Sequence, residues 1–224
     1  MLFGDFPSMT VHARAAYPSW PPREHQWRDQ DYDANFFAHA IKADRTKLKD
    51  RVKNLPIGLN GSRVRVSASN IPAAQSAFCS WAVQQLVTLN LSDVVLLAVP
   101  NSNATVQAVD FNIARIARQI AEMSNGRAQA CTALRFIEYR PKSERERRPS
   151  AAELRDNMTI VGAIPAGNIV LVDDVFTQGH HLTAATWSLP DGRDAPSHAL
   201  VAARTIKQPV LDVWDPITEE HLLL

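Results

Sequence analysis

The fold is decided by one stretch of the sequence, Asn168-Ile169-Val170-Leu171-Val172-Asp173-Asp174-Val175-Phe176-Thr177-Gln178-Gly179-His180-His181-Leu182. Its four apolar residues, 169–172, lie between a Gly-Asn pair and two acids, which predicts a central parallel strand buried on both faces. A Thr-x-Gly turn and the start of a helix follow. Ligands bind at the carboxyl end of such strands, and free N–H groups at a helix start favour phosphate. Adjacent carboxylates would repel that phosphate, so we expect them to hold sugar hydroxyls or a hydrated cation.

Composition sets wide bounds on function. The 224 residues suffice for one sizeable α/β domain with an appendage, or for two small domains. A formal net charge of +1 gives no global indication of nucleic-acid or membrane binding. No segment approaches the roughly 18 to 20 apolar residues of a membrane span, and the N-terminus lacks a signal pattern, so we expect a cytoplasmic protein. Cys79 and Cys131 lie in apolar surroundings and are expected in the core.

The first quarter of the chain has mixed patterns. Residues 1 to about 30 are rich in Pro, aromatic and charged residues without a clear period, which predicts an irregular arm. Residues 33–53 show a helical apolar stripe, and 64–66 predict a short strand after the Asn60-Gly61 turn. We therefore expect residues 1–60 to form an arm and amphipathic helix, serving as a hood or a partner contact.

Strands and helices alternate in the rest of the chain. Helical stripes at 78–89 and 109–123 flank an apolar strand at 94–99, and further strands are expected at 129–137 and 198–203. Ser150 and Glu153 form a capping box that opens a short helix. This alternation predicts an α/β domain over residues 61–210, with a mostly parallel twisted sheet flanked by helices, and a C-terminal tail at 211–224.

The acidic pair followed by Thr-x-Gly resembles the signature of the type I phosphoribosyltransferases. Val99-Pro100 at a strand end and Phe111-Asn112 at a helix start are similar to the ComF-like branch of that family, whose members resemble amidophosphoribosyltransferase domains. The resemblance covers about residues 75–205 and implies a type I phosphoribosyltransferase-like fold. It also implies magnesium-dependent transfer of a phosphoribosyl group from phosphoribosyl pyrophosphate (PRPP), within nucleotide metabolism.

The resemblance also implies site residues. Asp173 and Asp174 would hold the ribose hydroxyls directly or through magnesium-bound water. The Mg²⁺ ion would be bound through PRPP near these two residues, without direct protein ligands. The loop after the strand at 94–99 would face the pyrophosphate, and 140–149 would be a hood. The implied substrate-binding residues are Thr177, Gln178, Gly179, His180 and His181 for the 5′-phosphate, Pro100, Asn101, Ser102 and Asn103 for the pyrophosphate, and Arg145, Arg147 and Arg148 in the hood.

Each of these residues also has a simpler interpretation. Acids at strand ends are often only solvated, the hood arginines fit a salt-bridged surface loop, and the histidine pair fits a helix start at the surface. His181 stands where the family has a threonine, and an imidazolium there would favour anions. The segment 101–110 departs further from the pattern, because it has no cation to offset pyrophosphate charge.

Three functions therefore stay open. The first is a phosphoribosyltransferase acting on a nitrogen nucleophile and releasing pyrophosphate. The second is a regulatory module that binds PRPP or a nucleotide without turnover. The third is an interaction protein, for example an effector subunit of a bacterial defence cassette, whose arm (Trp20, Arg23, Trp27 and Arg28) and Lys47–Lys53 segment contact a protein or nucleic acid. The sequence does not indicate the acceptor base or the oligomeric state.

Overall fold

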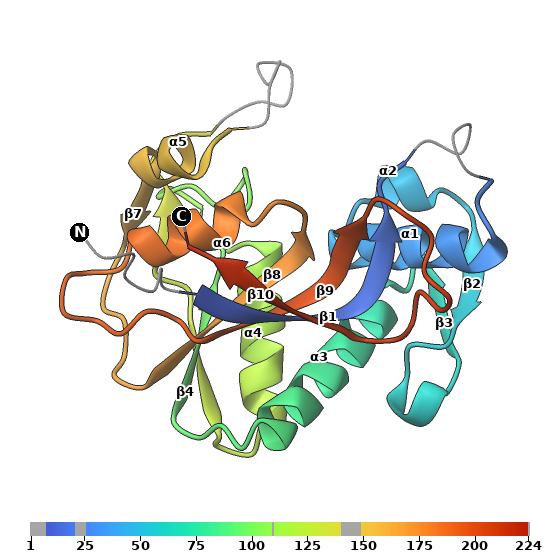
Figure 1. Ribbon diagram of the computed structural model, residues 1–224, viewed down its shortest axis with the longest axis horizontal. Helices are drawn as coiled ribbons and strands as arrows, with labels where there is room; N and C mark the ends of the chain where they lie inside the picture. The colour runs from blue at the N-terminus through green and yellow to red at the C-terminus, as the bar shows by residue number, and fades with distance from the viewer. Residues whose placement is uncertain (1–7, 21–25, 109, 140–148, 224) are drawn as a thin grey trace, which may run out of the picture.

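The computed structural model describes residues 8–20, 26–108, 110–139 and 149–223. Across these ranges the chain forms a six-stranded central sheet in the order β10-β1-β9-β8-β4-β5 (Figure 1). Neighbouring strands run parallel except β10, which pairs antiparallel with β1. The strands are β1 (Ser8–Pro18), β4 (Val94–Ala98), β5 (Ala128–Cys131), β8 (Asn168–Phe176), β9 (His198–Ile206) and β10 (Ile217–Leu222).

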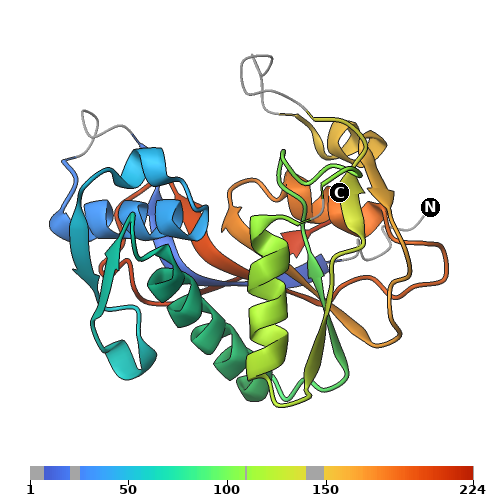
Figure 2. The same cartoon turned by 180° about the vertical axis from the view of Figure 1, so that it is seen from behind.

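Helices cover both faces of this sheet. Alternate residues of β8 point to opposite sides, so Val170 and Val172 join one apolar cluster and Ile169 and Leu171 join another. The first cluster includes α1 (Asp29–Ile41), α3 (Ile71–Thr88) and α4 (Asn112–Met123), seen from behind in Figure 2. The second includes α5 (Ala151–Asp156), α6 (His180–Trp187) and the antiparallel pair β6 (Leu134–Phe136) and β7 (Met158–Ile160). The predicted fold class, a mainly parallel sheet flanked by helices, is confirmed.

The expectation of an irregular N-terminal arm is wrong for residues 8–18. They form β1, which lies inside the sheet between β9 and β10. The sequence of this strand does not show a clear apolar alternation, because the polar residues His12 and Arg14 are also buried. The Arg14 guanidinium is accommodated because it donates hydrogen bonds to the carbonyl oxygens of Trp214 (2.7 Å) and Pro56 (3.2 Å).

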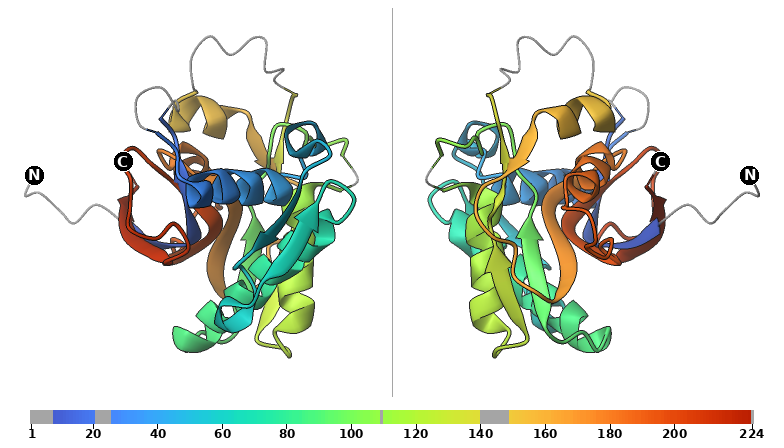
Figure 3. Two further views of the ribbon diagram at one scale, coloured as in Figure 1. Left: turned by 90° about the vertical axis from the view of Figure 1, so that its right-hand side faces the viewer. Right: turned by 90° about the vertical axis from the view of Figure 1, so that its left-hand side faces the viewer.

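Two other predicted elements are divided in the structure. The helix expected over 33–53 is α1 followed by the single turn α2 (Arg45–Leu48), and the chain then enters β2 (Val52–Leu55). A positive φ of 55° at Ala43 reverses the chain between the two helices. After the turn η1 (Leu59–Gly61), β2 pairs with β3 (Val64–Ser67) in a small ribbon that contacts α1 (Figure 3). The strand expected over 129–137 is β5 and β6, which belong to different sheets.

Other local predictions are confirmed. The helices predicted from the stripes at 78–89 and 109–123 are α3 and α4, and the buried strand at 94–99 is β4. The capping box opens α5, with the Ser150 N–H donating to Glu153 and the Glu153 N–H donating to Ser150 Oγ. Cys79 and Cys131 are free and buried, and burial raises the pKa of the Cys79 thiol to about 12.

The sheet reverses its winding between β4 and β8. From β4 the chain passes through α4 on one face to β5, whereas from β8 it passes through α6 on the other face to β9. The two strands are adjacent and parallel, yet their helices leave in opposite directions. In open α/β sheets the crevice outside the carboxyl ends of two such strands is where ligands bind. We therefore expect a ligand to contact the loops that follow β4 and β8.

Candidate functional site

The two aspartates of the signature lie in the last part of β8. Asp173 pairs with Val201 of β9, while β4 has already ended beside Val172, whose carbonyl accepts the N–H of Val99 (3.0 Å). One side of β8 is therefore without a strand neighbour at the acids. The alternation of the strand places Asp174 on the side of Val170 and Val172, toward the α1, α3 and α4 layer.

The two carboxyl groups are half-buried and close enough to repel each other. Burial, together with the neighbouring Asp174 carboxylate, raises the pKa of Asp173 well above its ordinary value of 3.8. Burial also raises the pKa of Asp174, while the positive charge of Lys42 acts in the opposite direction. Within the pair, Asp173 Oδ1 accepts the N–H of Asp174 (2.7 Å). Such carboxylates gain from nearby hydroxyl donors or a nearby cation.

The turn after β8 ends at the first residue of α6. Gly179 is the N-cap of this helix and has a φ of +80°, in the left-handed region that favours glycine. In the part of the chain described, the backbone N–H groups of Gln178 and Gly179 have no hydrogen-bond acceptor. They adjoin the unpaired N–H groups of the first turn of α6, and such N–H groups suit an anion.

The turn is fixed from behind by residues of β9 and β10. Arg204 donates a hydrogen bond to the Thr177 carbonyl (2.6 Å), pairs with Glu219 (2.8 Å) and stacks on the Phe176 ring at 4.6 Å. His221 of β10 lies directly over Gly179, where an added Cβ would come within 2.1 Å of the imidazole Cε1.

Side-chain hydroxyls complete this support. The Thr177 hydroxyl is 3.2 Å from the Thr205 hydroxyl, and Thr183 Oγ1 is 2.9 Å from His221 Nε2. Sequence reasoning missed Arg204, Thr205 and His221, because they lie in or after the last expected strand and form no motif with residues 173–181. The signal available was that an Arg-Thr pair follows the continuous apolar run 199–203.

The loop after β4 is the second predicted part of the site. Pro100 is buried next to the strand end, and Asn101, Ser102 and Asn103 are more exposed. This loop holds its own shape, since Asn101 Oδ1 accepts the Asn103 N–H (3.1 Å) and the Asn101 carbonyl accepts the Ala104 N–H (2.8 Å). Further on, Asp110 pairs with Arg118 (2.6 Å), and the N-cap of α4 is Phe111.

Phe136 of β6 joins the two loops. Its backbone N–H donates to the Ala104 carbonyl (2.9 Å), and its ring meets the His181 ring edge-on at 6.2 Å. The structure therefore brings the acid pair, residues 177–181 and residues 100–103 to one edge of the sheet. His180 Nδ1 lies 2.8 Å from the Pro149 carbonyl oxygen, to which it donates. The predicted hood residues Arg145, Arg147 and Arg148 lie outside the described residues.

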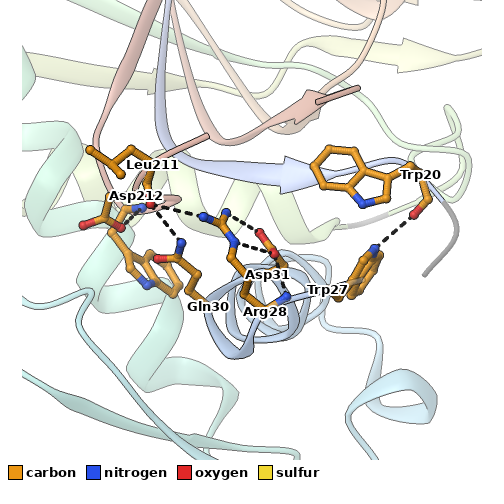
Figure 4. Close-up of polar contacts among 8 residues, drawn as sticks. Trp20, Trp27, Arg28, Gln30, Asp31, Leu211 and Asp212 are labelled. Carbon is orange, nitrogen blue, oxygen red and sulfur yellow. Dashed lines mark hydrogen bonds and ion pairs between the residues drawn. The ribbon is translucent and has the colours of Figure 1, made fainter. Parts of the chain in front are cut away.

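The arm residues suggested for partner binding pack on their own chain instead (Figure 4). Trp20 is buried, and the Trp27 indole N–H donates to the Trp20 carbonyl (3.2 Å). The Arg28 guanidinium pairs with Asp31 (2.9 Å) and reaches the Leu211 carbonyl (3.3 Å). These contacts give Trp20, Trp27 and Arg28 a structural role, and partner binding through the arm stays a prediction. Arg23 lies outside the described residues.

In the described ranges, no group of three or more His, Cys, Asp or Glu side chains is arranged to hold a metal ion. Two carboxylates nevertheless suit magnesium, which commonly takes one or two protein carboxylates and completes its shell with substrate phosphates and water. The donor set of Asp173 and Asp174 therefore fits a magnesium ion that arrives with a phosphorylated substrate. None of the described helices has both the length and the apolar character needed to cross a bilayer.

Comparison with family models and with curated proteins gives no match to this chain. Among solved structures, the orotate phosphoribosyltransferase from Aeropyrum pernix is 16% identical with a TM-score of 0.36, covering 75% of this chain and 81% of that chain. The APRTase from Giardia lamblia complexed with 9-deazaadenine is 14% identical with a TM-score of 0.31, covering 73% of this chain and 97% of that chain. These similarities are weak, and nothing about activity or substrate follows from them.

Proposed function

We propose that the β8–α6 junction binds the ribose 5-phosphate part of PRPP or a nucleotide, and that the protein is a phosphoribosyltransferase-like enzyme. The observation that supports this most is the position of the acid pair. Asp173 and Asp174 directly precede a glycine turn with unpaired N–H groups, at the point where the sheet reverses its winding. The resemblance of residues 173–179 to the phosphoribosyltransferase signature agrees with this assignment.

The phosphate end of the ligand would lie on the turn. The N–H groups of Gln178 and Gly179 and the first turn of α6 would donate to its oxygens. Such a cradle uses backbone groups, so it tolerates Gln178, His180 and His181 where the family has other side chains. His181 would add a positive charge when protonated.

The sugar end would lie on the carboxylates. Ribose 2′ and 3′ hydroxyls would donate hydrogen bonds to oxygens of Asp173 and Asp174, which offsets the burial and the mutual repulsion that raise the pKa of Asp173. Magnesium bound to the substrate would supply positive charge near the leaving pyrophosphate. The acids would hold the ribose and stabilise the positive charge that develops at its anomeric carbon.

The transfer itself needs few protein groups. The lone pair of the acceptor nitrogen bonds to the anomeric carbon, and the carbon–oxygen bond to pyrophosphate breaks with its electron pair going to the leaving group. The proton of the acceptor nitrogen is then lost to solvent. Preorganisation of both ends of the ribose by β8 and α6 is the contribution of this chain.

A second candidate is a binding module without turnover, and the loop after β4 favours it. Residues 100–108 contain no ionisable side chain. The neighbouring strand β6 carries a cation, Arg135, but this side chain already has partners in the protein. It stacks on Phe111 at 4.7 Å and donates to the carbonyls of Thr132 and Leu134. In this case the protein would bind a ribose phosphate and leave it intact.

Two measurements separate these candidates. Calorimetry with ribose 5-phosphate and with PRPP tests binding. Turnover is tested by incubating the protein with PRPP, magnesium and a panel of bases and measuring the pyrophosphate that is released. The control is the double variant Asp173→Asn/Asp174→Asn. An enzyme binds and releases pyrophosphate above the level of the control, whereas a module binds saturably without release. If the wild-type protein binds neither ligand better than the control, both candidates are rejected.

A further inference from the structure

The pyrophosphate of PRPP needs positive charge that the loop after β4 does not have. Residues 100–108 are uncharged, and in the following segment Asp110 adds a negative charge that engages Arg118. Backbone N–H groups and magnesium offset only part of the charge of a pyrophosphate. A cation from elsewhere in the fold would complete the site, and it has to reach the space in front of β4 and β8.

The C-terminal end of α1 is fixed at that space. The buried Asn112, the first residue of α4, donates a hydrogen bond from Nδ2 to the Ile41 carbonyl (2.5 Å). Gln75 of α3 holds the same amide, donating to Asn112 Oδ1 (2.9 Å). Because Asn112 is the first residue of α4, this bond fixes the end of α1, and with it the C-cap residue Lys42, near the place where the loop after β4 enters α4. Figure 2 shows α1 ending near the upper end of α4.

Lys42 also belongs to the surroundings of the acids. Asp174 lies on the face of β8 that is covered by α1, and α1 packs against β8. The charge of Lys42 lowers the pKa of both Asp173 and Asp174, against the larger effect of burial. No other cation in the described ranges acts on the two carboxylates together. The Lys42 side chain is exposed, and within the described residues it has no ion-pair partner.

The backbone holds this lysine in place. Lys42 is the C-cap of α1, its N–H donates to the Ala38 carbonyl (3.1 Å), and the chain then reverses at Ala43 through a positive φ of 55°. The ammonium group therefore stands at the end of a four-carbon side chain on a fixed backbone. A compact, flexible point charge of this kind suits a phosphate that moves as it leaves.

We infer that Lys42 forms a pyrophosphate subsite with the end of α1, in place of cations on the loop after β4. This rests on the proposed function, since it assigns the second phosphate group of the ligand that β8 and α6 would hold. The Lys42 ammonium would donate to pyrophosphate oxygens in the bound ligand and stabilise the negative charge as the bond to the ribose breaks.

The test compares two ligands that differ only in the pyrophosphate. Calorimetry with magnesium measures the dissociation constants of PRPP and ribose 5-phosphate for the wild type, for Lys42→Met and for Lys42→Arg. Lys47→Met, an exposed lysine of α2, is the matched control. We expect Lys42→Met to weaken PRPP binding about tenfold and to leave ribose 5-phosphate binding unchanged, while Lys42→Arg retains most of the PRPP affinity.

The outcomes are distinguishable. If Lys42→Met weakens both ligands equally, or neither, while the wild type binds both, then the subsite is rejected and the proposed function stands. An equal loss of PRPP affinity in Lys47→Met would also reject the subsite, because it would indicate a general charge effect. If the wild type binds neither ligand, the proposed function is rejected and the subsite with it.

Discussion

The two loops at the carboxyl edge of the sheet are built in different ways. The turn after β8 is supported by side chains from three other elements: Arg204 and Thr205 of β9, His221 of β10 and Thr183 of α6. The loop after β4 is supported by its own Asn101 and by the backbone of β6. The turn after β8 is thus held by charged side chains from β9 and β10. The loop after β4 has no ionisable side chain at residues 100–108 and is held mainly by its own residues. The difference indicates that recognition is concentrated on the β8 side.

The largest difference should appear when one polar group is removed from the end of β8 and one from the loop after β4. Asp174→Asn removes a carboxylate that would accept ribose hydroxyls, so we expect ribose 5-phosphate to bind about 10- to 100-fold more weakly. Ser102→Ala in the loop after β4 should change this affinity less than about twofold. Calorimetry on both variants measures the contrast, and equal effects would remove the distinction between the loops.

A methyl group at Gly179 should damage the turn itself. Gly179→Ala places a Cβ against the His221 ring in a left-handed conformation, and we expect a loss of at least about 2 kcal/mol in the free energy of unfolding. The double variant Gly179→Ala/His221→Ala relieves the clash but not the backbone strain, so part of the loss should return. Urea unfolding of the two variants and of His221→Ala alone completes the cycle. Additive effects would show that the imidazole does not constrain the turn.

The acid pair should lower stability as the pH rises. The folded state keeps the pKa of Asp173 above 3.8, so above that pH the folded protein binds more protons than the unfolded chain. The free energy of unfolding therefore falls as the pH rises through this window. Asp173→Asn should make the protein more stable at pH 7 and flatten this dependence, whereas the exposed Asp215→Asn should not. Thermal unfolding between pH 4 and pH 8 measures both, and an unchanged slope in Asp173→Asn contradicts the prediction.

The smallest effect is expected from adding charge to the neutral loop. Asn103→Arg supplies an exposed cation where the sequence has none, and exposed pairs contribute about 1 kcal/mol or less. PRPP should then bind up to about fivefold more tightly, with ribose 5-phosphate unchanged and Asn103→Gln as the neutral control. Tighter binding of both ligands would point to general electrostatic attraction instead of a local contact.

The sequence alone predicted the parts of this fold that follow from local patterns. The buried run at 169–172 and the stripes at 78–89 and 109–123 are confirmed as β8, α3 and α4, because each has the periodicity of its element. The acid pair and residues 177–181 were expected at the carboxyl end of this strand. The acids lie in the last part of β8, and residues 177–181 follow it. Their assignment to ribose and phosphate stays a prediction, as do magnesium, the ComF-like branch and the domain boundaries.

Long-range pairing explains what the sequence did not reveal. β1 is a strand because β9 and β10 lie on either side of it, roughly 190 and 210 residues further along the chain. Its Arg14 breaks the apolar alternation and is accepted only because carbonyls of residues 56 and 214 lie beside it. His221 likewise reaches the turn through β10, and Lys42, the proposed pyrophosphate residue, comes from the end of α1; no spacing within the sequence connects them to residues 173–181.

The antiparallel pair β1–β10 makes the order of the proposed binding turn depend on a strand that is synthesised about 40 residues after it. Glu219 and His221, which hold Arg204 and Gly179, are fixed in register only when Val11 and Met9 of β1 have found their partners. A ribosome-bound chain that has made the helix α6 but not β10 would therefore possess every residue of the signature and still lack an ordered turn. Ligand binding by nascent chains of increasing length would then begin abruptly once β10 has left the ribosome.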